Sequence, residues 1–246
     1  MFKKILLILS ALILIGYLVF TITYLNPKVG NDLICKKVDV EVVDSLNRSY
    51  LTTQEVMDIL IQNELNPIDK KMSYIKTDDI KNLLEKNRLI KKTECFKTID
   101  GSIRIKIYQR IPILRLFSSE TSYYVDSEGE KFPIPRNFSA YVPVASGSFN
   151  NEKFDHEKLY EFALFLAENK FWNSQIEQIH IAPNLDVELI PRVGNHHIVL
   201  GDINNYKENL EKLKLFYDKG LNKIGWNRYS IINLKYKNQV VCTKVR

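Results

Sequence analysis

The longest apolar run of the chain lies at its start. Residues 5–25 carry no formal charge over 21 positions. At a rise of about 1.5 Å per residue, a helix of this length measures about 31 Å, which matches the roughly 30 Å hydrocarbon core of a bilayer. The apolar region of a cleaved signal peptide is usually shorter and ends in small residues. The pattern therefore favours an uncleaved transmembrane helix over a signal peptide.

The flanking charges give this helix an orientation. Lys3 and Lys4 precede it, and basic residues beside a membrane span favour the cytoplasmic side. Three lysines on the far side weaken the bias. We expect residues 1–4 to form a cytoplasmic tail and residues 26–246 to lie outside the cytoplasm.

Beyond the span, polar and apolar residues alternate strictly over residues 38–42, which predicts a strand with one buried face. Two helices are predicted next. Thr52 and Glu55 have the spacing of a capping box, in which each side chain satisfies a free amide at a helix start. Thr77 is predicted to cap the second helix, with two aspartates after it that complement the helix dipole.

Two more strands follow these helices, at residues 90–98 and 103–108. Asp100-Gly101 between them supplies the positive φ angles of a tight hairpin turn. Strand, helix, helix, strand and strand then occupy residues 38–110. This order predicts a compact α+β domain whose two helices pack on one face of its sheet.

A second domain is predicted for residues 111–246. Pro112 cannot donate to a strand ladder, so the Arg110 to Pro112 segment should end the first sheet. Short strands are predicted at residues 114–117, 122–126, 131–134, 141–145, 176–182, 185–190 and 197–200. The fold class is therefore α+β, with a second domain that is mostly antiparallel β structure.

Two helices and a hairpin complete this second domain. Asp155 is predicted to cap the first helix, and the second is predicted to run from Tyr206 to Gly220, a residue typical of helix ends. After Trp226, the chain should close with two strands joined by a two-residue turn at Asn238-Gln239. Because no later segment covers the last strand, its outer edge should be open.

Charge and cysteine content exclude several classes of function. The net charge is +6, and without Lys3 and Lys4 the rest carries only about +4, too little and too dispersed for nucleic-acid binding. The three cysteines have neither the CxxC spacing nor the rhythm of zinc ligands. A disulfide between Cys35 and Cys95 is possible.

Catalytic and cofactor motifs are missing. The sequence has no HExxH, GxSxG or glycine-rich phosphate loop. His196 and His197 are neighbours in a predicted strand, where side chains point to opposite faces, so they do not form a metal site; a polar turn and strand surface is the simpler interpretation. We predict no catalytic residues, no metal, no cofactor and no small-molecule substrate. A membrane-tethered hydrolase is the least favoured alternative.

Three segments resemble the FtsQ/DivIB family of bacterial cell-division proteins, in its Bacteroidetes-like form. They are IRIKIYQRIPILRLF at 103–117, YYVDSEGEKFPIP at 123–135 and NLKYKNQVVCTK at 233–244. The resemblance implies a POTRA domain at residues 38–110 and an FtsQ-type β domain at 111–246. Gln109 stands where many members carry an acid, which weakens the case for a salt bridge there.

The resemblance also implies partners and a location. Proteins of this family are single-pass scaffolds of the inner membrane at the septum, with the bulk of the chain in the periplasm. Their C-terminal strands bind FtsB- and FtsL-like membrane proteins, and their POTRA domain recruits other division proteins. Tyr236 falls at the family's interfacial tyrosine. The predicted partner-binding residues are Tyr236, Asn238, Gln239, Val240 and Val241.

Two residues of the first matching segment, Arg110 and Pro112, are predicted to fix the domain junction rather than to touch a ligand. One alternative function remains from another class, a POTRA-bearing component of outer-membrane assembly or secretion. Such proteins usually repeat the module and end in a membrane barrel. A single predicted POTRA domain after an amino-terminal span argues against it.

Overall fold

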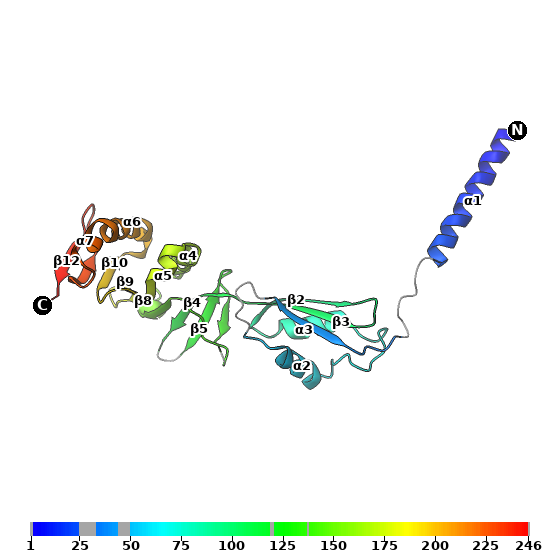
Figure 1. Ribbon diagram of the computed structural model, residues 1–246, viewed down its shortest axis with the longest axis horizontal. Helices are drawn as coiled ribbons and strands as arrows, with labels where there is room; N and C mark the ends of the chain where they lie inside the picture. Colours follow the sequence, from blue (N-terminus) through cyan, green and yellow to red (C-terminus); the bar gives the residue numbers. More distant parts are fainter. Residues whose placement is uncertain (1, 25–32, 44–49, 119–120, 137, 246) are drawn as a thin grey trace. The chain divides into compact units, whose positions relative to one another are not determined.

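The structure is a computed structural model that describes residues 2–24, 33–43, 50–118, 121–136 and 138–245. Side chains are described from residue 10 to 21 and from residue 33 onward within these ranges. The chain divides into two compact units, Met1–Gln109 and Arg110–Arg246 (Figure 1). Each unit has its own core.

The first unit begins with helix α1, Phe2–Tyr24. The exposed side chains described in it are almost all apolar. Residues 1 and 25 of the predicted tail and span lie outside the described residues. A search of the described part of the chain finds no helix with the length and hydropathy of a membrane span. The transmembrane helix stays a prediction.

A three-stranded sheet and two helices form the rest of this unit. Strand β3 (Ile103–Gln109) lies in the middle, parallel to β1 (Val38–Val43) and antiparallel to β2 (Ile90–Lys97). Helices α2 (Thr53–Gln62) and α3 (Thr77–Glu85) stand between β1 and β2 in the chain. The predicted order of strands and helices is confirmed.

The helix starts show which local predictions hold. The amide of Glu55 donates to the Thr52 hydroxyl at 3.1 Å, and the amide of Thr52 donates to the Glu55 carboxylate at 2.8 Å, so the capping box is confirmed. The predicted cap of the second helix is wrong. Lys76 occupies the N-cap position without a side-chain bond, and Thr77 is already the first helical residue.

The core of the first unit lies on one face of β3. Its alternate residues Ile103, Ile105 and Ile107 are fully buried, in one cluster with apolar residues of both helices. The helix residues in this cluster include Val56, Leu60, Ile80 and Leu84. The predicted packing of both helices on one sheet face is confirmed.

The cysteines are all free thiols, so the possible bridge between Cys35 and Cys95 is not formed. Cys35 is buried in the core of the first unit, and Cys95 packs beside that core. Burial raises the pKa of the Cys95 thiol to about 11. Because the thiolate is the reactive form, we expect Cys95 to be unreactive at neutral pH.

The second unit is built on a mixed sheet, which has nine strands in its described part. The first strand of the unit, β4, begins at Pro112, a position where a missing amide donor is tolerated. The pairs β4–β7, β7–β8 and β10–β11 are parallel, and the other five are antiparallel. In spatial order the strands are β12 (Val241–Lys244), β11 (Tyr229–Asn233), β10 (His197–Gly201), β9 (Val187–Pro191), β8 (Ile176–Ile181), β7 (Val144–Gly147), β4 (Pro112–Phe117), β5 (Ser122–Asp126) and β6 (Lys131–Pro133).

More helical structure covers this sheet than the sequence predicted. Asp155 caps α4 (His156–Glu168) through the amide of Lys158, as expected. The short α5 (Lys170–Gln175), capped by Asn169, was missed. The predicted end at Gly220 is wrong: α6 (Tyr206–Phe216) continues as the π-helix η3 (Tyr217–Leu221) and α7 (Asn222–Ile224), and Gly225, at φ 95°, ends the run.

The helices of this unit gather on one side of the sheet (Figure 1). On that face, Ile179, Leu189 and Ile198 are fully buried, together with Phe162 of α4 and Leu213 of α6. Alternate strand residues point to the opposite face because side chains along a strand change face at every position. That opposite face carries partly exposed and largely polar residues, and we call it the open face. Gln178, His180, Glu188 and Asn233 lie on it.

Candidate functional site: the β12 edge and its groove

Strand β12 forms one end of the nine-stranded sheet. It pairs antiparallel with β11, with Val241 opposite Asn233 and Cys242 opposite Ile232. On its other side, no strand among the described residues lies beside it. Alternate amides and carbonyls of an edge strand point away from its neighbour. Those of β12 are therefore available to another chain.

The connection between β11 and β12 differs from the predicted two-residue turn. Residues 234–240 join the strands, so Tyr236, Asn238, Gln239 and Val240 lie in a loop, and Val241 is the first residue of β12. The chain leaves β11 early because Leu234 is fully buried and its amide donates to the carbonyl of Val199 at 2.9 Å. Asn238 has a φ of 60°, which asparagine adopts more readily than most residues.

Two lysines hold this loop. The ammonium group of Lys212, on α6, donates to the carbonyl of Leu234 at 2.7 Å and to that of Tyr236 at 3.0 Å. Lys235 pairs with Asp186 at 2.5 Å. With the backbone bound on both sides, the Tyr236 side chain projects outward and is 49% exposed. An anchored loop therefore presents this aromatic ring beside the β12 edge.

A groove of about 740 Å³ lies between this loop and the α6–η3 helix. Leu215, which is 55% exposed, and Val240 give the groove apolar lining side chains. We call this hollow the α6 groove. Its lining residues are Glu208, Glu211, Lys212, Leu215, Phe216, Lys219, Gly220, Asn238, Gln239 and Val240.

The sequence predicted part of this groove. Asn238, Gln239 and Val240 were named as partner-binding residues and do line it. Of three charged residues on the helix, Lys207, Glu211 and Lys214, Glu211 lines the groove and the two lysines do not. Lys207 and Lys214 instead lie over the rings of Tyr206 and Phe171. Leu215 was missed, although an apolar residue outside the buried stripe of an amphipathic helix is itself a signal.

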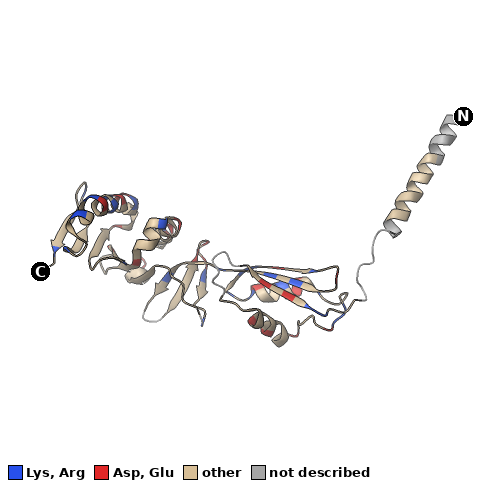
Figure 2. Ribbon diagram, viewed as in Figure 1, with Lys and Arg blue, Asp and Glu red and all other residues tan. Residues whose placement is uncertain are grey.

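Charges of both signs surround the groove. Basic and acidic residues follow one another along the ribbon of α6 (Figure 2). Glu208, Glu211, Lys212 and Lys219, all from the α6–η3 helix, contribute two charges of each sign to the lining. Such a rim favours an apolar segment flanked by polar residues of both signs over a strongly anionic or cationic ligand.

A buried aromatic cluster supports the sheet near this edge. His196 is 1% exposed, and its Nε2 lies 3.1 Å from the Tyr217 hydroxyl, while the Trp226 ring packs nearby. The expected polar surface role of His196 is therefore wrong. Burial, reinforced by the charge of His197, lowers the pKa of His196, and burial raises the pKa of Tyr217.

The predicted junction residues lie at the start of the second unit. Arg110 forms a 2.6 Å ion pair with Asp126, whose side chain is 3% exposed. The other oxygen of Asp126 accepts hydrogen bonds from the amides of Glu128 and Glu130, which stabilises the turn after β5. The ion pair joins two of the segments on which the family resemblance rests, and the departure at Gln109 does not prevent it. Whether Arg110 and Pro112 fix the domain junction stays a prediction.

No group of three or more metal-ligating side chains occurs among the described residues. His180 and Ser146 do form a hydrogen-bonded pair. No hydrogen bond or ion pair to an acidic side chain orients that histidine in the described part of the chain, so the pair lacks the third member of a hydrolytic triad.

Profiles of known protein families match both units. The family described as a POTRA-like domain matches residues 33–108, and the family described as FtsQ/DivIB, C-terminal related, matches residues 111–243. Together these matches define a POTRA-bearing protein of bacterial cell division. Because the second match covers more than half of the chain, the chain belongs to the FtsQ/DivIB family.

This result confirms the resemblance seen in the sequence. The FtsQ/DivIB family is a family of non-catalytic scaffolds of cell division that associate with the membrane at the division site. A search of curated proteins finds no significant match to the chain.

Proposed function

We propose that this protein is a single-pass scaffold of the inner membrane that holds FtsB- and FtsL-like division proteins at the septum by strand addition to β12. The observation that carries this proposal is the position of β12 at the end of the nine-stranded sheet, with no described strand on its outer side. A partner strand placed there would complete the ladder with backbone hydrogen bonds.

The surroundings of β12 supply the selectivity that backbone bonds lack. Val241 is 43% exposed, and Tyr236 presents its ring from the anchored loop just before the strand. A segment of the partner next to its added strand would enter the α6 groove and contact Leu215. Tyrosine is one of the residue types that most often carry the binding energy of a protein interface, so Tyr236 is the proposed anchor.

Membrane attachment rests on the sequence and on α1. The run of 21 residues without charge is long enough to cross a bilayer, and residues 5–24 of it belong to helix α1. With Lys3 and Lys4 on the cytoplasmic side, the short tail would lie in the cytoplasm and the folded units in the periplasm. A membrane anchor would keep the β12 edge close to partners that are themselves membrane proteins.

The POTRA unit is proposed to recruit other division proteins. Its strands β1 and β2 are the two edges of a three-stranded sheet. Edge strand β2 carries Lys91, Lys92, Glu94 and Lys97, and charged residues on an edge limit unspecific strand pairing. Strand β1 has a less charged sequence, VDVEVV, and is the more favourable edge for strand addition.

Co-purification tests the central part of this proposal. With tagged full-length protein in dividing cells, Tyr236→Ala should reduce recovery of the FtsB-like partner at least about tenfold, since loss of an interfacial tyrosine commonly costs 2 kcal/mol or so. The control is Tyr74→Ala, at a tyrosine of the first unit that is 77% exposed. Recovery at the wild-type level with Tyr236→Ala would contradict the assignment of this residue.

A further inference from the structure

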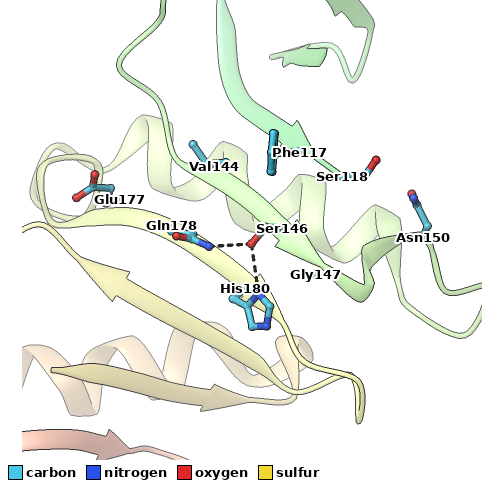
Figure 3. A pocket seen from close by; sticks show the side chains of 9 residues that line it. All are labelled: Phe117, Ser118, Val144, Ser146, Gly147, Asn150, Glu177, Gln178 and His180. Carbon is cyan, nitrogen blue, oxygen red and sulfur yellow. Dashed lines mark hydrogen bonds between the residues drawn. The ribbon is translucent and has the colours of Figure 1, made fainter. Parts of the chain in front are cut away.

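A hollow of about 670 Å³ lies on the open face of the nine-stranded sheet, at strands β4, β7 and β8. Figure 3 shows its side chains arranged around a hydrogen-bonded trio of Gln178, Ser146 and His180. We call it the open-face hollow. It is lined by Phe117, Ser118, Val144, Ser146, Gly147, Asn150, Glu177, Gln178 and His180.

The hollow lies where three mutually parallel strands end. Strand β7 is parallel to both β4 and β8. Phe117 ends β4, Gly147 ends β7, and His180 is the last residue but one of β8. Val144, the first residue of β7, and Gln178 of β8 also line it, so the hollow extends along these strands on the open face.

The trio fixes which atoms face a ligand. The Gln178 amide donates from Nε2 to the Ser146 Oγ at 2.8 Å, and this Oγ lies 3.2 Å from Nδ1 of His180. With Nδ1 engaged by Ser146, the hollow offers Nε2 of His180 and the carbonyl oxygen of Gln178 as hydrogen-bonding groups.

Glycine at position 147 is required for this arrangement. Gly147 has a φ of 89°, and a Cβ atom there would come within 2.2 Å of the Ile181 carbonyl oxygen and 2.8 Å of Cε1 in His180. Only a residue without a side chain lets the imidazole lie so close to the end of β7. The His180 ring therefore packs directly against the backbone of Gly147.

The remaining lining residues define the chemistry of the ligand. Phe117 is 49% exposed, with the Arg115 guanidinium 5.8 Å from its ring centroid. Asn150 adds a second neutral amide. None of the nine lining residues is Lys or Arg, and Glu177 carries the single formal charge. Phosphates and other anions are thereby disfavoured, and a neutral ligand with several hydrogen-bonding groups and one apolar face is favoured.

We propose that the open-face hollow binds a neutral saccharide. The exposed Phe117 ring would pack against the apolar face of a sugar ring, as aromatic residues do with flat apolar surfaces. Nε2 of His180 and the Gln178 carbonyl would each form a hydrogen bond with a sugar hydroxyl, which can donate or accept, and Asn150 would bind a further hydroxyl. This inference concerns residues other than the β12 edge and does not depend on the proposed partner binding.

Binding of defined sugars to the full-length protein in detergent tests the proposal. The probes are chitotetraose and cellotetraose, measured by saturation-transfer NMR and by calorimetry. At least one should bind the wild-type protein, and Phe117→Ala should weaken that binding about tenfold, which corresponds to the loss of one good aromatic contact. Gln178→Ala should weaken it about threefold or more through the lost hydrogen bond.

Tyr236→Ala is a matched control, because Tyr236 and Phe117 are both 49% exposed and lie in the same unit. It should bind the sugar like the wild type. Phe117→Ala should retain the division partner, so failure of either proposal can be recognised separately. Circular dichroism melting verifies that each variant folds. Absence of binding to both sugars, wild-type affinity with Phe117→Ala, or selective binding of a carboxamide-bearing peptide in place of sugars would overturn the proposal.

Discussion

The two edges of the nine-stranded sheet are built in opposite ways. Strand β6 has three residues, one of which, Pro133, has no amide hydrogen, and Pro135 follows two positions later. Strand β12 has four residues and no proline, and an exposed valine begins it. Proline on an edge strand blocks pairing with another chain. The β6 edge therefore has a residue that cannot donate a backbone hydrogen bond to another strand, whereas the β12 edge can accept a strand.

The environments of the two edges reinforce this difference. Strand β6 pairs with β5, whose Tyr124 is fully buried. The Tyr124 hydroxyl accepts a hydrogen bond from the amide of Ala140, so this tyrosine is engaged within the unit and is not available to a partner. Beside β12, the anchored loop exposes Tyr236, and the α6 groove exposes Leu215. An edge with exposed apolar anchors has the means to recognise a particular strand, whereas an edge without them does not.

The largest expected effect comes from removing the buried residue under each edge. Phe132→Ala in β6 and Ile232→Ala in β11 delete side chains that are 1% and 0% exposed. Each should lower the free energy of unfolding by about 2–5 kcal/mol, measured by urea denaturation. Only Ile232→Ala, which removes the support of β12, should also lower partner recovery in conditions where both variants are folded. Equal loss of recovery from both would remove the distinction between the edges.

A charge placed at the open edge should act on binding and leave stability nearly unchanged. Val241→Lys adds to β12 the type of residue that protects exposed edges. Because Val241 is 43% exposed, the free energy of unfolding should change by no more than about 0.5 kcal/mol. The affinity for the partner should fall about tenfold or more in a pull-down titration. The matched change at the other edge, Lys131→Glu, should leave affinity unaltered. Unchanged affinity with Val241→Lys would count against strand addition.

Replacing Lys212, which bonds the loop from α6, should have an intermediate effect on stability and on partner binding. Lys212→Met keeps an apolar stem but removes the two bonds to the carbonyls of Leu234 and Tyr236. We expect a loss of about 1–2 kcal/mol in stability and a weaker partner complex, because the loop is no longer held in its binding conformation. Lys219→Met is the control, since Lys219 lines the same groove without a described bond to the loop. Equal effects of the two substitutions would show that loop anchoring is unimportant.

Lowering the pH should reduce the free energy of unfolding by a smaller amount, through His196 in the aromatic cluster near β12. The pKa of His196 is lowered in the folded protein, so the unfolded state binds the proton more tightly. Stability from the neutral histidine is present above its unfolded pKa of about 6.5 and is lost as the pH falls through the lower folded value. Denaturation followed by the fluorescence of Trp172 and Trp226 should show this loss between pH 7.5 and pH 5.

His196→Leu should reduce that dependence on pH, since it removes the titrating group. Tyr217 would then lack the bond to His196, so the variant should also be less stable at neutral pH. A pH dependence identical to that of the wild type would assign the acid effect to other groups. Strand β6 contains no histidine, so acid should not act on that edge in the same way.

Local signals predicted most of the strands and helices, because caps, stripes and alternation depend on residues close in sequence. The capping box at Thr52 and the cap at Asp155 are of this kind. The errors arose where distant contacts decide. Burial of Leu234 beneath the sheet lengthens the last connection, and packing of Tyr217 and Leu221 carries the helix past Gly220. Local propensity yields to such tertiary contacts.

The candidate site was predicted only in part for the same reason. The sequence indicated the residues from Tyr236 to Val241 through family resemblance and through their place at the end of the chain. It could not show that Lys212 binds the loop, because that bond joins residues more than twenty positions apart. The Arg110–Asp126 pair and the Ser146–His180 pair likewise depend on how strands are placed side by side.

The most direct test of the open edge is a photo-crosslinking scan in dividing cells. A crosslinking amino acid is placed in turn at positions 241 and 243 on β12 and at positions 131 and 133 on β6, in the full-length protein. Strand addition predicts capture of one membrane division protein from the β12 positions and none from the β6 positions. Equal capture from both strands, or capture from β6 alone, would contradict the claim that β12 is the edge that accepts a partner.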